Sequence, residues 1–194
     1  RQTAKQALGE PVDERRSLPR LILEYWQNWL WKQIVEQDWM PRKLIRSPDD
    51  LGGLVSLSKP ELVEVIDLLG VFDVIPNLRN AIQASEQKFW AQVLSERQKQ
   101  LAQKLLQQPA WPGQLPLAIG QASVSEAARS LHQRGCLRLG TALIGTSDSL
   151  IWNIVHHLDR GRGQLVHEAA GQRTSQEATA AARTALSLVL REFR

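Results

Sequence analysis

Apolar residues recur at intervals of three and four along most of the chain, and no segment alternates apolar and polar residues over the length of a strand. Intervals of three and four follow the turn of an α-helix, whereas a half-buried strand alternates at every second residue. The pattern therefore predicts an all-α protein. We expect a single compact multi-helix domain, built either as one body or as two packed helical halves.

Proline, glycine and polar residues divide the chain into four parts. Residues 1–17 are polar and carry no firm apolar pattern, so we expect a flexible lead-in. Residues 18–108 predict an N-terminal helical half and residues 123–194 a C-terminal helical half. Between them, residues 109–122 predict a Pro-rich connector, because prolines and a glycine interrupt any regular element.

The clearest helix signal begins at Ser58. Ser58 and Glu61 have the spacing of a capping box, in which two side chains satisfy free backbone N–H groups at the start of a helix. The apolar stripe that follows predicts a helix ending at Gly70, followed by helical sequence with a break or kink near Pro76. Residues 42–57, with their proline, aspartate and glycine pairs, predict a loop.

Serines mark the starts of further helices. Ser85 and Ser95 can each cap one, and Ser123 can cap a helix that reaches about residue 143. Gly135 lies on the apolar side of that last helix, where the lack of a side chain permits a close neighbour.

The remaining C-terminal sequence predicts two more helices. The first is capped by one of the residues 146–148 and is expected to stop at Gly161. Residues 161–175 are expected to form a loop or a short helix, and the last helix is expected to run from about residue 176 to residue 193.

The composition fits a protein that folds in the cytoplasm. No apolar run approaches the roughly 20 residues that a membrane span needs, and no secretory signal opens the chain. The single cysteine, Cys136, cannot form an internal disulfide, and its place in a predicted helix indicates a buried structural thiol. Because the chain begins with Arg1 instead of methionine, we expect residues upstream of this sequence.

The positive charges show one local excess. The formal net charge is +4. An excess of arginine can contact phosphate or an acidic partner, and it can equally be a solvated basic face. The residues concerned are Arg129, Arg134, Arg138, Arg160 and Arg162, against Asp148 and Asp159.

No pattern of reactive residues predicts catalysis. His156 and His157 are adjacent, so on a helix their side chains point about 100° apart and do not easily hold one metal ion. The sequence lacks a phosphate-binding glycine loop, and no nucleophile has a recognisable base nearby. We therefore predict no catalytic, cofactor-binding or metal-binding residue, and a protein that is not an enzyme.

Four of the seven tryptophans lie between residues 25 and 40. On a helical wheel, Trp26 and Trp29 fall on the apolar side and are explained by burial. Trp31 and Val35 fall on the polar side and contact each other as an i, i+4 pair. They indicate a second contact surface, which faces either another helix of the domain or a partner protein. The neighbouring charges are mixed in sign, so we predict no platform for stacking nucleic-acid bases.

Two segments resemble the SctK family, the YscK- and OrgA-type accessory components of bacterial type III secretion machines. The first is LLGVFDVIPNLRNAIQAS at residues 68–85, followed by PAWP at residues 109–112. The second follows a similar order and spacing through Arg129, Gly135, Leu139, Ala142 and Trp152. Together these segments cover about half of the chain, and their matching residues are mostly helix-packing and small residues.

The resemblance implies a non-enzymatic part of the cytoplasmic sorting platform. Such proteins link the pod protein SctQ to the cytoplasmic domain of the inner-membrane ring protein SctD, beneath which the SctL and SctN ATPase complex lies. It implies no cofactor, no nucleic acid, and a cytoplasmic location that reaches the inner membrane only through partners. The alternative hypothesis is a basic helical nucleic-acid-binding or regulatory protein.

The residues that we predict at a protein interface come from the helical wheel and the charge count alone. The wheel supplies two of them and the charge count four. They are Trp31, Val35, Arg134, Arg138, Arg160 and Arg162.

Replacing Trp31 with alanine is expected to weaken partner assembly while leaving the fold largely intact. Trp26→Ala is instead expected to lower the free energy of unfolding by about 3–5 kcal/mol, because it truncates a core side chain. Chemical denaturation and a partner-binding assay distinguish the two effects. If both variants lose stability equally, Trp31 belongs to the core and the predicted second surface does not exist.

Overall fold

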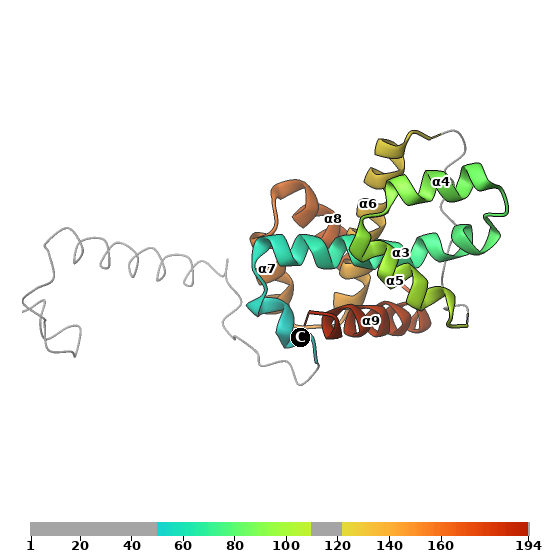
Figure 1. Cartoon of the computed structure of the whole chain (residues 1–194). Helices are drawn as coiled ribbons and strands as arrows, with labels where there is room; N and C mark the ends of the chain where they lie inside the picture. The colour runs from blue at the N-terminus through green and yellow to red at the C-terminus, as the bar shows by residue number, and fades with distance from the viewer. Residues whose placement is uncertain (1–49, 110–121, 194) are drawn as a thin grey trace, which may run out of the picture. The chain divides into compact units, whose positions relative to one another are not determined.

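The computed structural model describes residues 50–109 and 122–193. These residues form seven α-helices and one 3-10 helix, and no strand occurs among them, which confirms the predicted all-α class (Figure 1). By its internal contacts the chain divides into two units, Arg1–Lys43 and Leu44–Arg194, and every described residue belongs to the second. The predicted lead-in, the tryptophan-rich segment and most of the Pro-rich connector lie outside the described residues.

The order of the elements along the chain follows the labels of Figure 1. They are η1 (Asp50–Ser56), α3 (Lys59–Asn80), α4 (Ala84–Val93), α5 (Glu96–Leu106), α6 (Val124–Leu143), α7 (Asp148–His157), α8 (Arg160–Ala170) and α9 (Gln176–Arg191). Within the described ranges, no helix combines the length and the hydropathy that a membrane span requires.

Helix α3 runs through the middle of this unit and is buried around its whole circumference over residues 68–75 (Figure 1). It is covered by α5, α6 and α9, so no side of this stretch faces solvent. A helix enclosed in this way is apolar all round instead of carrying a single stripe. The predicted end at Gly70 is therefore wrong, because the helix continues through Gly70 and through Pro76 to Asn80.

Gly70 lies inside α3 because α6 crosses there at backbone distance. A Cβ atom at Gly70 would overlap the carbonyl oxygen of Leu131, and a Cβ atom at Gly135 would overlap the carbonyl oxygen of Ile66. Each helix thus places one glycine against the backbone of the other. This reciprocal contact, which we call the glycine crossing, confirms that Gly135 serves close packing.

The helices on either side of the connector share one hydrophobic core. Helix α9 packs on both α3 and α6, and the Arg183 guanidinium donates to the carbonyl oxygens of Ala142 and Ile144 at the end of α6. Helix α8 packs on α6 at Gly140, where a Cβ atom would overlap the Val166 carbonyl oxygen. The described parts of the two predicted halves therefore form a single packed body.

Most of the predicted helix starts are confirmed. The backbone N–H of Ser58 donates to Glu61, and Ser95 and Ser123 form capping boxes as their spacing predicted. Ser147 is the residue among 146–148 that caps α7. Ser85 is not a cap, because the N-cap of α4 is Gln83, two residues before the predicted cap.

The prediction that Gly161 stops a helix is wrong. Helix α7 ends at His157, and the Asp159 carboxylate then accepts a hydrogen bond from the Arg162 backbone N–H and begins α8. Gly161 is the second residue of α8, which extends to Ala170 through most of the segment predicted as a loop or a short helix. At the N-terminus of the unit, residues 50–56 of another predicted loop form η1, and at the C-terminus α9 ends at Arg191.

Two glycine-to-alanine variants distinguish the effect of the glycine crossing on stability from the effect of helix propensity. Gly135→Ala is expected to lower the free energy of unfolding by about 1–3 kcal/mol or more, because its methyl group overlaps the Ile66 backbone. Gly161→Ala is expected to be neutral or to stabilise by up to about 1 kcal/mol, because a Cβ atom there lies 3.7 Å from its nearest neighbour. Urea unfolding measures both, and equal effects would contradict the close contact at Gly135.

Candidate functional site

Charged residues lie on both sides of the glycine crossing. On α3, Asp67 and Asp73 stand three residues before and after the glycine. On α6, His132 and Arg138 stand three residues before and after theirs. Asp67 pairs with His132 and Asp73 pairs with Arg138. The crossing is therefore flanked by two acid–base pairs, which differ in burial.

The pair of Asp73 and Arg138 is inside the protein. Its side chains are only 7% and 10% exposed, and the Arg138 guanidinium lies 5.7 Å from the centre of the Phe72 ring. Burial raises the pKa of Asp73, and the charge and hydrogen bond of Arg138 act against that rise. Arg138 Nε is buried without a hydrogen-bond partner among the described residues. These features indicate a structural ion pair.

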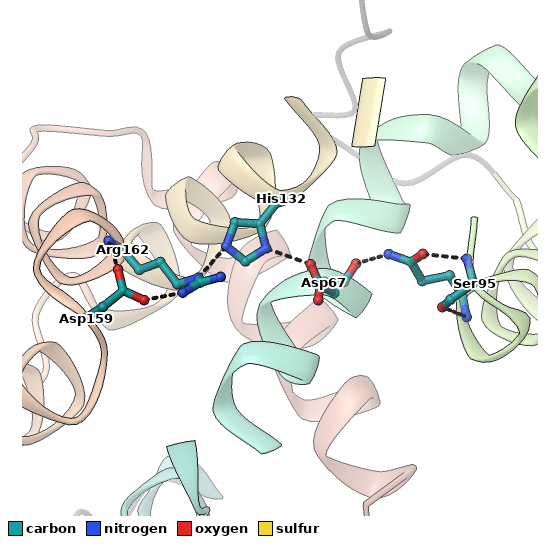
Figure 2. Close-up of polar contacts among 6 residues, drawn as sticks. Asp67, Ser95, His132, Asp159 and Arg162 are labelled. Atoms are coloured by element: carbon teal, nitrogen blue, oxygen red, sulfur yellow. Dashed lines mark hydrogen bonds and ion pairs between the residues drawn. The ribbon is translucent and has the colours of Figure 1, made fainter. Parts of the chain in front are cut away.

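The second pair belongs to a longer chain of polar contacts. The Arg162 guanidinium donates to the Asp159 carboxylate, and its Nε also donates to His132 Nε2 at 2.7 Å (Figure 2). His132 Nδ1 lies 2.6 Å from Asp67 Oδ1. This part of the chain of contacts links α8, α6 and α3.

The same chain of contacts extends to α5. Gln98 Nε2 donates to the backbone carbonyl of Asp67 at 3.1 Å (Figure 2). Gln98 Oε1 accepts from the Ser95 backbone N–H at 2.8 Å, which completes the capping box of α5. The six residues from Asp159 to Ser95, which we call the polar relay, thus connect four helices.

His132 is the titratable centre of the polar relay. Hydrogen bonds, first with Asp67 and then with Cys136, and the negative charge of Asp67 raise its pKa to about 9 against the opposing effect of burial. Cys136 itself is fully buried, as predicted for a structural thiol.

A pocket of about 180 Å³ lies beside the polar relay. It is lined by residues of α3, α6 and the junction of α4 with α5, including Asp67, Ser95 and Gln98 of the relay. Glu64 and Arg97 also line it and form an ion pair with each other. The Arg97 guanidinium in addition lies over the Phe193 ring, which holds the residues after α9 against α5.

The arginines predicted as interface residues occupy different surroundings. Arg138 is engaged by Asp73 in the interior, and Arg162 by Asp159 and His132. Arg134 is half-buried on α6, and Arg160 is exposed at the start of α8. Counting charges along the sequence thus overstated the free basic surface, because two of these guanidinium groups bind carboxylates of the same chain. Trp31 and Val35 lie outside the described residues.

The adjacent histidines are exposed in the last turn of α7. The His156 ring stacks on Trp152 with ring centroids 4.0 Å apart. In the described ranges, no three His, Cys, Asp or Glu side chains are placed to hold a metal ion.

Sequence reasoning missed Asp67, Asp73, His132 and Gln98. Asp73 carried a usable signal, because a lone carboxylate within the apolar run of residues 71–75 requires a buried partner. Asp67 and His132 look like ordinary surface positions of amphipathic helices. Their pairing depends on how α3 crosses α6, which no local pattern specifies.

Comparison of the chain with models of protein families, with curated proteins and with solved structures found no match.

Arg138→Met is expected to lower the free energy of unfolding by about 3–5 kcal/mol at neutral pH, because it leaves the Asp73 carboxylate buried without its partner. Since burial already raises the pKa of Asp73, acidification neutralises this carboxyl and reduces the loss. Urea unfolding at about pH 7 and about pH 4.5 measures the change.

Two further variants control this measurement. The double variant Asp73→Leu, Arg138→Met is expected to recover most of the lost stability, because neither charge remains. Arg134→Met, one turn earlier on α6, removes only a weaker charge interaction with Asp73 and is expected to cost less than about 1 kcal/mol. A loss for Arg138→Met that stays the same at both pH values would contradict the assignment to Asp73.

Proposed function

We propose that the chain is a non-enzymatic adaptor of a type III secretion sorting platform. In this role it links an SctQ-type pod protein to the cytoplasmic domain of an SctD-type inner-membrane ring protein. It lies in the cytoplasm and reaches the membrane, and the SctL and SctN ATPase complex, only through these partners. The proposal rests on the resemblance of two segments to the SctK family.

One observation supports this proposal above the others. The segments that carry the resemblance, residues 68–85 and the stretch from Arg129 to Trp152, include both sides of the glycine crossing. Gly135, Leu139 and Ala142 of the second segment are buried against the core. The similar residues therefore include several that determine how the central helices pack.

The arrangement of the arginines favours a protein partner over nucleic acid. Binding to phosphates depends on several cations that are free to contact the backbone and to release counterions. Of the five arginines in the basic segment, Arg138 and Arg162 are held by Asp73 and Asp159. Arg160 remains exposed and can pair with an acidic residue of a partner.

Co-purification with SctQ- and SctD-type proteins tests the proposal. The chain is expected to be retained by both, and Arg160→Glu is expected to weaken retention roughly fivefold by reversing one exposed charge. Arg173→Glu changes an exposed arginine outside the predicted set and serves as the matched control, with retention unchanged.

Failure of both partners to bind, under conditions where their own complexes form, would refute the adaptor role. Titration with DNA and RNA at rising salt tests the alternative hypothesis in parallel. A steep loss of affinity with salt would support nucleic-acid binding, whereas no measurable binding would exclude it as the main activity.

A further inference from the structure

The contacts of His132 define where its proton lies. Arg162 Nε carries a hydrogen and can only donate, so His132 Nε2 at 2.7 Å must accept (Figure 2). The hydrogen of a neutral ring then lies on Nδ1, which donates to Asp67 Oδ1 at 2.6 Å. The observed contacts fit one state of the ring, which is neutral with its hydrogen on Nδ1.

A second proton on His132 strengthens one of these two contacts and removes the other. The bond to Asp67 becomes an ion pair and is strengthened. On the opposite side, Nε2–H of a charged ring faces N–H of a charged guanidinium, and the two groups repel. Arg162 has an alternative partner, because it already donates to the Asp159 carboxylate at the start of α8.

We propose that His132 is a proton-controlled joint of the fold. In its neutral form it ties α8 to α3 through Arg162 and Asp67. In its protonated form it keeps Asp67, repels Arg162 and loosens the first turn of α8 from α6. The two sides of the ring respond to the same proton in opposite directions.

The groups that face His132 come from three elements. Asp67 approaches from α3, Arg162 and its partner Asp159 from the start of α8, and Cys136 from the next turn of α6. Glu64 and Arg97 line the adjoining pocket but are paired with each other. Arg129, one turn earlier on α6, acts on Glu126.

These groups determine the pH at which the joint changes. Hydrogen bonds with Asp67 and Cys136 raise the pKa of His132 to about 9 against the effect of burial. The guanidinium that donates to Nε2 disfavours a proton on that nitrogen. A raised histidine pKa stabilises the fold at pH values below the ordinary value of 6.5, and this contribution is lost as pH rises through about 9. The hydrogen bond from Arg162 Nε to His132 Nε2 forms over the same pH range, as the ring loses its second proton.

The proposal does not depend on the adaptor role. It concerns the attachment of α8, whose first turn also carries the exposed Arg160.

Nuclear magnetic resonance of the full chain between about pH 6 and pH 10 tests the joint. The ¹⁵N shifts of the His132 ring, assigned with the His132→Gln variant, report the proton on Nε2. Hydrogen-exchange protection of residues 163–166 reports the attachment of α8, with residues 185–190 of α9 as the internal reference. Protection of α8 is expected to rise as Nε2 loses its proton, while that of α9 stays constant.

The variant Arg162→Met tests whether the pH dependence of α8 protection comes from the contact between His132 and Arg162 or from a general effect of pH on the protein. Without the guanidinium, the His132 midpoint is expected to rise by about one pH unit, and α8 protection is expected to stop following pH. Arg160→Met, in the same turn but exposed, is expected to leave both unchanged.

An unchanged midpoint in Arg162→Met, or α8 protection that does not follow the titration of His132 in the unmodified chain, would overturn the proposal. The second measurement needs no substitution, so it decides the matter even where Arg162→Met does not fold.

Discussion

The backbone contact between α3 and α6 at Gly70 and Gly135 is the constraint on which the rest of the structure depends. A glycine inside a helix costs about 1 kcal/mol relative to alanine, so two of them at one crossing require a gain from packing. The gain is the close approach of two helices that lie on opposite sides of the connector. Helices α5 and α9 then pack on α3, and α8 and α9 on α6.

The crossing has two ends of different character. At one end Asp73 and Arg138 are enclosed by the packing around them. At the other, His132 is 22% exposed and Asp67 40% exposed, and a pocket opens beside them. The same pair of helices therefore carries one ion pair in the interior and one acid–base pair that is partly exposed. Only the second pair is substantially exposed to solvent.

The sequence predicted the features that neighbouring residues determine. The caps at Ser95 and Ser123 and the close packing at Gly135 follow from spacing alone. The prediction failed at Gly70, because a glycine that ends a helix and a glycine that lies under a neighbouring helix look the same in sequence. It failed at Gly161 because a glycine in the first turn of a helix looks the same in sequence as one that ends a helix. The interior partner of Arg138 was missed for a related reason, since it lies 65 residues away along the chain.

The crossing can be written as two short strings of equal spacing. The segment at residues 67–73 is Asp-x-x-Gly-x-x-Asp, and the segment at residues 132–138 is His-x-x-Gly-x-x-Arg. The glycines are fixed by backbone contact, whereas the charged positions are fixed only as pairs. A distant relative can therefore reverse the charges of one pair or replace both with apolar residues and keep the fold. A search for relatives should therefore look for both sequence patterns at once, and allow the charged positions to vary only as pairs.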